Sequence, residues 1–262
     1  MPGNEKKIVE YLVQKKGKIS LCHMGLVVSV GAPGVAKGKC FEINNIKDIN
    51  RYLVTEDSKK KADIYINNHG VSLKQSGPTF SYNRLQRANL EEIFGLLGFK
   101  DSGLILARLD QEVMQFHKGK LEGRNRPWSN FFSEREFKAL LKYLMTEGSP
   151  NEGYSIHPAE FILEAPCGNI LECDIAIYTF EEYFNRYKDT FKIAIRRQWV
   201  GQASNSEHKR AKGLTKKPGN APWVFNDVAG VPNLHRSGKI WRDDIPAKER
   251  KTVYFLMIEK EG

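Results

Sequence analysis

The sequence contains few cysteines and no long hydrophobic run. Its four cysteines, Cys22, Cys40, Cys167 and Cys173, include no CxxC pair and no spacing typical of a disulfide framework, so we expect reduced thiols. The longest uncharged apolar stretch, Met24–Ala36, is shorter than the ~20 residues of a membrane-spanning helix. The first residues show no apolar signal-peptide region. We therefore expect a cytoplasmic protein without a membrane partner.

Acidic residues are scarce relative to basic ones. There are 31 Asp and Glu against 41 Lys and Arg, which leaves a formal net charge of +10. Between residues 192 and 242 there are eleven basic residues and only two acidic ones, Glu207 and Asp227. This basic segment also contains Trp, Gln and Asn, whose side chains stack on nucleobases or bond to their edges. It predicts nucleic-acid binding, with a solubilising surface as the plainer alternative.

Several residues of the basic segment are candidates for phosphate or base contacts. They are Arg196, Arg197, Gln198, Gln202, Asn205, Lys209 and Arg210.

Apolar spacing along the chain predicts a mixed order of helices and strands. We expect a short first helix that contains residues 8–13, further helices over 83–98, 133–145 and 179–187, and strands within 19–43 and over 62–75, 161–165, 169–178, 191–195 and 253–260. Gly17 is the expected C′ residue of the first helix, and 117–128 is an expected loop. Ser133 with Glu136, and Thr179 with Glu182, have the spacing of capping boxes. The predicted fold is a single α/β (α+β) domain over 1–262, with a mixed central sheet flanked by helices.

The segment ADIYINNHGVSLK, residues 62–74, predicts a β-hairpin. With Asn68 and His69 at its turn, Asp63 faces Lys74 and Tyr65 faces Ser72, while the apolar residues between them face a core. A carboxylate beside an ammonium group suits metal-assisted phosphodiester hydrolysis. An ordinary cross-strand salt bridge would have the same pattern.

This hairpin resembles the signature of the PD-(D/E)xK nuclease superfamily, with Asp63, Ser72 and Lys74 at its three positions. The order of predicted elements is similar to that of small type II restriction endonucleases that cut short, four-base-type sites. The resemblance implies a restriction-endonuclease-like core in which Asp63 binds the metal and Lys74 orients water. It also implies that Glu5, in the helical segment NEKKIVEYL, is a helper carboxylate and second metal ligand.

Ser72 departs from the common pattern, which has a carboxylate or an amide at this position. A hydroxyl is a weaker, neutral ligand, so we expect Ser72 to bind metal weakly or through water. Either the family tolerates serine, or Glu5 or Glu10 supplies the missing oxygen, or the chain is a catalytically inactive relative. Glu172 and Asp174, on the expected strand 169–178, are an alternative metal site.

For DNA recognition, the resemblance points to Tyr82, Asn83 and Arg84 at the entrance of the helix after the hairpin. Arg recognises guanine and Asn recognises adenine in the major groove. An aromatic ring can insert between base steps. Asn83 is also a plausible helix N-cap.

The resemblance implies Mg²⁺-dependent, sequence-specific hydrolysis of double-stranded DNA that leaves a 5′-phosphate. The expected setting is the bacterial cytoplasm, with a cognate DNA methyltransferase as functional partner but no direct contact, and with a monomer or homodimer as the active form. Residues 1–110 would hold the catalytic core, and 130–262 would form the recognition half with a DNA cleft. The alternatives are a non-catalytic DNA- or RNA-binding protein and a structure-specific or repair nuclease of the same superfamily.

Overall fold

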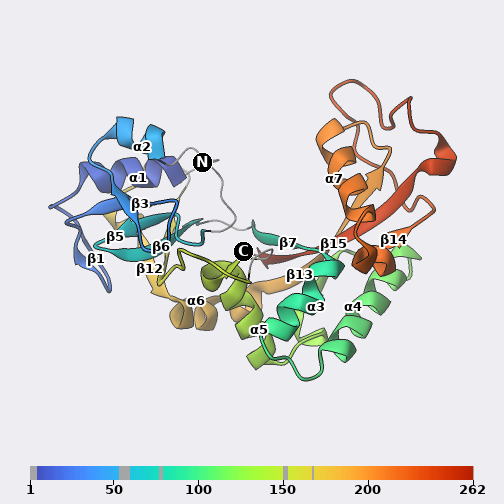
Figure 1. Cartoon of the computed structure of the whole chain (residues 1–262), viewed down its shortest axis with the longest axis horizontal. Helices are drawn as coiled ribbons and strands as arrows, with labels where there is room; N and C mark the ends of the chain where they lie inside the picture. The colour runs from blue at the N-terminus through green and yellow to red at the C-terminus, as the bar shows by residue number, and fades with distance from the viewer. Residues whose placement is uncertain (1–4, 53–59, 77–78, 150–152, 167, 262) are drawn as a thin grey trace. The chain divides into compact units, whose positions relative to one another are not determined.

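The computed structural model describes residues 5–52, 60–76, 79–149, 153–166 and 168–261. They form two compact units, and each unit is built from separate chain segments (Figure 1). Unit 1 comprises Met1–Phe80, Lys138–Thr190 and Lys260–Gly262, and unit 2 comprises Ser81–Phe137 and Phe191–Glu259. Neither unit coincides with the halves 1–110 and 130–262 expected from the sequence.

Unit 1 is centred on a six-stranded mixed sheet with the order β12-β11-β6-β5-β3-β4. The strands are β3 Val30–Pro33, β4 Cys40–Glu42, β5 Ile64–Ile66, β6 His69–Gln75, β11 Phe161–Ala165 and β12 Ala176–Thr179. Strands β6 and β11 are parallel, whereas the other pairs are antiparallel. The helices of this unit include α1 Glu5–Gln14, α2 Ile46–Tyr52 and α6 Phe180–Tyr187. The predicted mixture of helices with a mixed sheet is confirmed.

Helix α1 covers one face of this sheet. Ile8, Val9 and Leu12 recur at helical spacing, are completely buried, and share a core with Ile64 and Leu73. The chain leaves the helix through Gly17, whose φ of +75° is accessible to glycine at little cost. The predicted first helix is therefore confirmed, although it ends at Gln14, so the left-handed Gly17 lies one residue beyond the C′ position.

Two capping boxes begin helices where the sequence predicts them. The Thr179 hydroxyl accepts a hydrogen bond from the Glu182 N–H at 3.2 Å, and the Glu182 carboxylate accepts the Thr179 N–H at 2.8 Å. Ser133 and Glu136 make the same reciprocal pair at the start of α5 Glu134–Lys142. Each box satisfies backbone donors that a helix leaves unpaired in its first turn.

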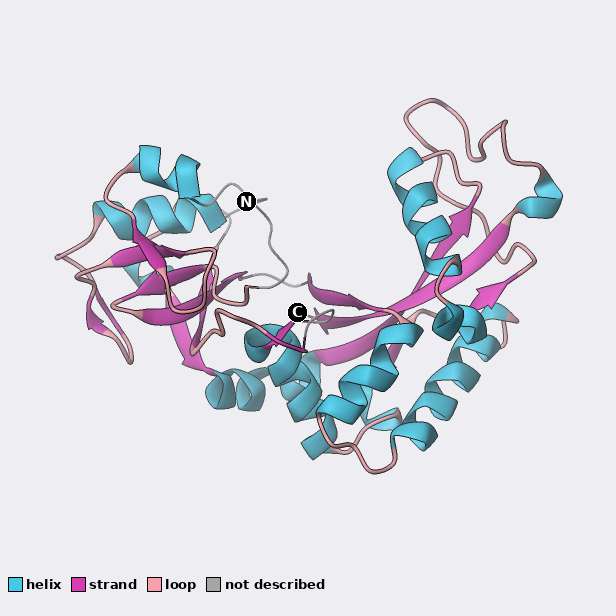
Figure 2. Ribbon diagram, viewed as in Figure 1, coloured by secondary structure: helices cyan, strands magenta, loops and turns pink. Residues whose placement is uncertain are grey.

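Unit 2 contains a second sheet, with the order β14-β15-β13-β8 and with β7 also paired to β15 (Figure 2). Its strands are β7 Thr79–Leu85, β8 Asn125–Pro127, β13 Phe191–Val200, β14 Val224–Phe225 and β15 Lys251–Glu261. Its helices include α3 Arg87–Leu96, α4 Ser102–His117 and α7 Asn205–Thr215.

Helices cover both faces of the long strand β15. Ala211 and Leu214 of α7 pack with Val253 and Phe255. On the alternate side of the strand, Tyr254 contacts His117 at the end of α4, with 3.2 Å between the tyrosine oxygen and Nδ1. Because side chains alternate along a strand, α7 and α4 lie on opposite faces of β15.

Three predictions of local structure are wrong. The helix expected from residue 83 begins at Arg87 with Gln86 as its N-cap, and residues 79–85 form β7, so Asn83 is not the cap. Strand β8 lies within the expected loop 117–128, where it pairs with β13. Glu172 and Asp174 lie in an exposed 3₁₀ turn instead of a strand. In the first two cases a strand distant in the sequence supplies the hydrogen bonds, which overrides local preference.

Helix α4, the longest helix among the described residues, was not expected from the sequence. None of the described helices has both the length and the apolar composition needed to cross a membrane. Cys22, Cys40 and Cys173 are free thiols, as expected, and all three are exposed; Cys167 lies outside the described residues.

Candidate functional site

The register of the hairpin β5–β6 differs from the expected one. Asn67 and Asn68 form its turn with φ values of +49° and +68°, and Ile66 pairs with His69. A two-residue turn of this kind needs positive φ at both positions, which asparagine tolerates better than histidine. The prediction that Asp63 lies opposite Lys74 is therefore wrong. The predicted apolar face is confirmed, because Ile64, Ile66, Val71 and Leu73 are all buried.

Asp63 lies at a bulge just before β5. Its backbone N–H donates to the Val71 carbonyl at 2.9 Å, although Val71 pairs with Ile64. Asp63 and Ile64 thus both lie opposite Val71, which is the arrangement of a β-bulge. A bulge changes the direction of the side chains next to it. The Asp63 Oδ2 atom accepts the Leu73 N–H at 2.7 Å and lies 3.3 Å from the Ser72 hydroxyl.

Lys74 is close to the same group of atoms. Its Nζ atom donates to Ser72 Oγ at 2.7 Å and to the Leu73 carbonyl at 3.1 Å. The Ser72 hydroxyl therefore bridges the ammonium of Lys74 and the carboxylate of Asp63. Despite the shifted register, the structure brings together all three residues that the sequence analysis singled out in this hairpin.

The pKa values of the neighbouring charged groups are perturbed by burial. Burial raises the pKa of Asp63, while the Lys74 ammonium and the Leu73 N–H act in the opposite direction. Burial, reinforced by the Lys74 charge, lowers the pKa of Lys61 to about 8. Lys61 was not predicted as a site residue, although the sequence places it only two residues before Asp63. The cluster thus holds two lysines near one carboxylate.

The two carboxylate oxygens of Asp63 have different surroundings. Oδ2 is hydrogen-bonded, whereas Oδ1 accepts no hydrogen bond from the described residues. The described part of the chain contains no group of three or more His, Cys, Asp or Glu side chains placed to hold a metal. Mg²⁺ is often held by one or two carboxylates, with water and substrate phosphate as the other ligands. Asp63 is the one carboxylate that this cluster offers among the described residues, so binding of Mg²⁺ through Oδ1 stays a prediction.

The helper role expected for Glu5 has no support from the position of its helix. Glu5 opens α1, which packs against the face of the sheet bearing Ile64 and Leu73. Ser72, whose hydroxyl contacts Asp63, alternates with Leu73 and lies on the opposite face. Completion of the metal site by Glu5 stays a prediction. Glu10, the other proposed oxygen donor, forms an ion pair with Lys6 at 3.8 Å.

A buried charged cluster lies on the next strand. Glu164 of β11 pairs in parallel register with Lys74, so both side chains are on the same face. Its carboxylate accepts hydrogen bonds from Tyr183 at 3.0 Å, Tyr187 at 2.7 Å and Lys260 at 2.7 Å. The signal in the sequence was a single acidic residue within the apolar strand FILEA.

His157 anchors the backbone that leads into Asp63. Its carbonyl accepts the N–H groups of Lys61 and Ala62, each at 2.9 Å. Its ring is completely buried, with Nε2 3.1 Å from the Gly34 carbonyl and Nδ1 2.7 Å from the Tyr65 hydroxyl. A donor is needed at Nε2 to bond a carbonyl, so Nδ1 accepts the tyrosine proton. This histidine was not predicted as part of the site.

Unit 2 brings together basic residues from two of the predicted recognition segments. The pKa of Arg84 is lowered first by burial and then by the charges of Arg210 and Arg196, with Glu207 opposing them. The Arg84 guanidinium lies 5.4 Å from the centre of the Phe255 ring. Arg84 is in β7, not at a helix entrance, and the side chains of Tyr82 and Asn83 lie outside the described residues.

The recognition candidates on β13 and just after it are engaged in packing. Arg196 forms an ion pair with the buried Glu259. Arg197 donates to the Tyr254 hydroxyl at 3.0 Å and stacks 4.9 Å from the centre of the Phe116 ring. Gln198 and Gln202 are 6% and 2% exposed. These contacts favour a structural role.

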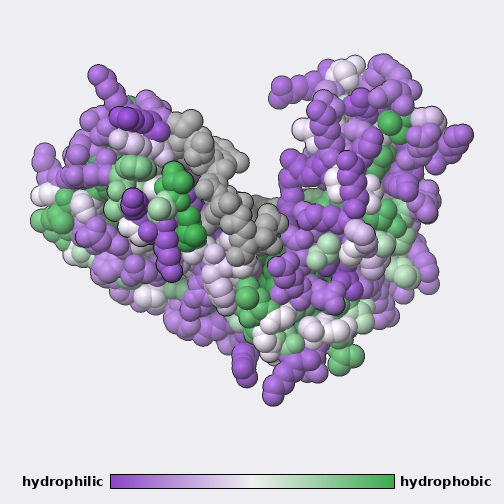
Figure 3. All heavy atoms as spheres, viewed as in Figure 1, coloured by the Kyte–Doolittle hydropathy of each residue, from purple (hydrophilic) through white to green (hydrophobic). Residues whose placement is uncertain are grey.

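The candidates on α7 are placed differently. Asn205, Lys209 and Arg210 are all exposed. Figure 3 shows a predominantly hydrophilic surface over α7 in this view. An exposed helix with this composition can contact phosphates.

Comparisons with protein families, curated proteins and solved structures found no match for this chain.

Proposed function

We propose that the protein is a type II restriction endonuclease, which hydrolyses phosphodiester bonds of double-stranded DNA at a specific site in the presence of Mg²⁺. The observation that carries the proposal is the hydrogen-bonded cluster of Asp63, Ser72 and Lys74. These three residues occupy the positions of the PD-(D/E)xK signature. The exposed basic residues of α7 support DNA as the substrate.

The chain's own residues would perform distinct tasks in this reaction. Asp63 would hold Mg²⁺ through Oδ1, and the ion would stabilise negative charge on the scissile phosphate. Lys74, positioned by its bond to Ser72, would orient the attacking water and neutralise charge in the transition state. The bulge and the Leu73 N–H would keep the carboxylate in place.

The test is cleavage of unmodified plasmid DNA with and without Mg²⁺. The wild-type protein should give discrete fragments only with the metal, and Lys74→Ala should lower the rate by at least ~10²-fold. Lys37→Ala removes an exposed lysine outside the cluster and should cleave like the wild type. Intact plasmid under all conditions, or equal loss in both variants, would contradict the proposal.

A non-catalytic DNA-binding protein is the second candidate. It is favoured by the single carboxylate in the cluster and by Ser72 at the position where the signature has a stronger ligand. Gel shifts that weaken steeply with salt, without cleavage of plain or branched duplexes, would support it. Cleavage confined to branched or damaged DNA would instead indicate a structure-specific or repair nuclease of the same superfamily.

A further inference from the structure

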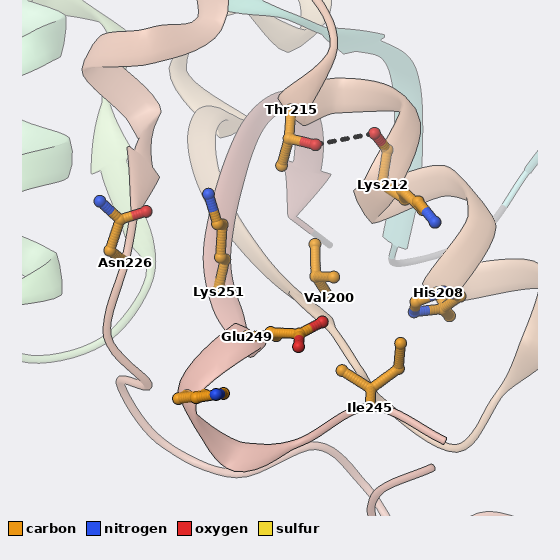
Figure 4. Close-up of a pocket in the computed structure, with 9 residues that line it drawn as sticks. Val200, His208, Lys212, Thr215, Asn226, Ile245, Glu249 and Lys251 are labelled. Carbon is orange, nitrogen blue, oxygen red and sulfur yellow. Dashed lines mark hydrogen bonds between the residues drawn. The ribbon is translucent and has the colours of Figure 1, made fainter. Parts of the chain in front are cut away.

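A second candidate site lies in unit 2, in a pocket of about 440 Å³ beside α7 (Figure 4). Its lining comes from β13, α7, the segment after β14, the turn before β15 and the start of β15. The residues are Val200, His208, Lys212, Thr215, Asn226, Ile245, Lys248, Glu249 and Lys251. The volume lies within the range of small-molecule sites, which is about 300 to 1,000 Å³.

The lining of this pocket is positively charged. Lys212, Lys248 and Lys251 come from three different elements, and none of them forms an ion pair within the described residues. Glu249 is the sole carboxylate among the lining residues. Three ammonium groups around one cavity favour an anionic ligand.

His208 contributes a fixed hydrogen-bond donor to the wall. It is 7% exposed, and its Nδ1 atom accepts the Gly201 N–H at 2.9 Å. Because Nδ1 is an acceptor, the ring proton of the neutral form is on Nε2. Burial lowers the pKa of His208, and the charges of Arg242 and Lys212 lower it further, so the neutral form prevails near pH 7. No described residue accepts a hydrogen bond from Nε2.

The remaining lining offers an apolar surface and an amide. Val200 and Ile245 present aliphatic side chains, and Asn226 lies across the pocket from His208 in Figure 4. Aliphatic groups can cover the flat face of a ring, and an asparagine amide can bond to the edge of a base such as adenine. The pocket thus combines groups for a phosphate with groups for a planar heterocycle.

We propose that this pocket binds a nucleoside monophosphate unit, with its phosphate attracted by the lysines that line the pocket and its base against the aliphatic side chains of Val200 and Ile245. This assignment goes beyond the proposed function and does not depend on DNA cleavage. The unit has two possible sources, a free nucleotide or a nucleotide turned out of bound DNA. The chemistry of recognition is the same for both.

The first experiment is calorimetric titration of the full chain with dAMP, deoxyadenosine and inorganic phosphate. The expected result is tighter binding of dAMP than of either fragment, weakened at least 10-fold by Lys212→Gln or Lys251→Gln. The matched control is Lys216→Gln, an exposed lysine just after α7 that does not line the pocket, and it should change affinity less than twofold. Thermal unfolding of each variant checks that it is folded.

The second experiment identifies the source with a DNA duplex containing 2-aminopurine. Fluorescence that rises on binding, and that excess dAMP suppresses, would indicate a nucleotide turned out of the duplex. Binding of dAMP without that signal would indicate a free nucleotide. The proposal is overturned if neither assay is positive, if dAMP binds no better than inorganic phosphate, or if Lys216→Gln weakens binding as much as the pocket variants.

Discussion

The Nζ atom of Lys74 lies 2.7 Å from the Oγ atom of Ser72, two residues earlier on the same strand. Ser72 therefore accepts a hydrogen bond from the lysine and donates one toward Asp63. A carboxylate at this position would contact the same groups but would add a negative charge for a metal.

Replacing Ser72 by aspartate should tighten metal binding. If the protein is the proposed nuclease, the Mg²⁺ concentration for half-maximal cleavage should fall by about 10-fold, because a second carboxylate strengthens a hard-cation site. Ser72→Asn, which adds an oxygen ligand without charge, is the matched comparison and should change the requirement less. An unchanged Mg²⁺ dependence in Ser72→Asp would show that residue 72 does not face the metal.

Asp63→Asn should abolish cleavage and stabilise the fold at pH 7. Burial raises the pKa of this carboxyl, so the folded state resists its ionisation, and stability is lost as pH rises through the unfolded and folded pKa values. The amide oxygen can still accept the Leu73 N–H. We expect a rise in Tm of about 2 to 4 °C, corresponding to about 1 kcal/mol.

Thermal unfolding at several pH values checks this sign. The advantage of Asp63→Asn should disappear in acid below the unfolded pKa of an aspartate, where the wild-type carboxyl is protonated in both states. If Asp63→Asn is less stable than the wild type at pH 7, the contacts of the ionised carboxylate stabilise the fold by more than the burial of its charge destabilises it.

Breaking the buried pair of Glu164 and Lys260 should destabilise unit 1. Glu164→Gln leaves the ammonium of Lys260 buried without its carboxylate, at an expected cost of about 3 to 5 kcal/mol. Glu164→Gln combined with Lys260→Met should recover part of that loss. Urea unfolding measures both effects. Unchanged stability in Glu164→Gln would argue against a structural role for this cluster.

The basic residues of unit 2 should separate into two groups. Lys209→Ala and Arg210→Ala should each reduce the salt dependence of DNA binding by about one counterion, because both side chains are exposed. Arg196→Ala should mainly lower Tm, because it removes the partner of the buried Glu259. Binding titrations at several salt concentrations, paired with thermal unfolding, test this division.

His208 should titrate below the ordinary histidine pKa of 6.5. Because the folded pKa is lowered, the folded state binds fewer protons than the unfolded state in mild acid, and stability falls as pH drops below about 6.5. NMR titration of the ring measures the midpoint. Arg242→Gln should raise it, since the Arg242 charge contributes to the shift, and an unshifted midpoint in this variant would contradict that cause.

The local sequence determined much of the framework. Apolar spacing predicted α1 through Ile8 and Leu12, and reciprocal capping residues predicted the starts of α5 and α6. The hairpin was predicted because strand alternation and an Asn-rich turn are visible within thirteen residues. Each of these features depends on residues that are close to one another in the sequence, so the sequence alone contains the information needed to predict them.

Tertiary structure decided which predicted residues meet and what each contacts. The turn at Asn67 and Asn68 set a different register from the expected one, yet the Asp63 carboxylate still lies beside Ser72. Pairing with the distant β15 made residues 79–85 a strand. Burial against Glu259 gave Arg196 a structural partner, although the sequence suggested an exposed DNA contact. Local patterns thus determined the type of most elements, whereas long-range pairing and burial, which depend on residues far apart in the chain, determined the site.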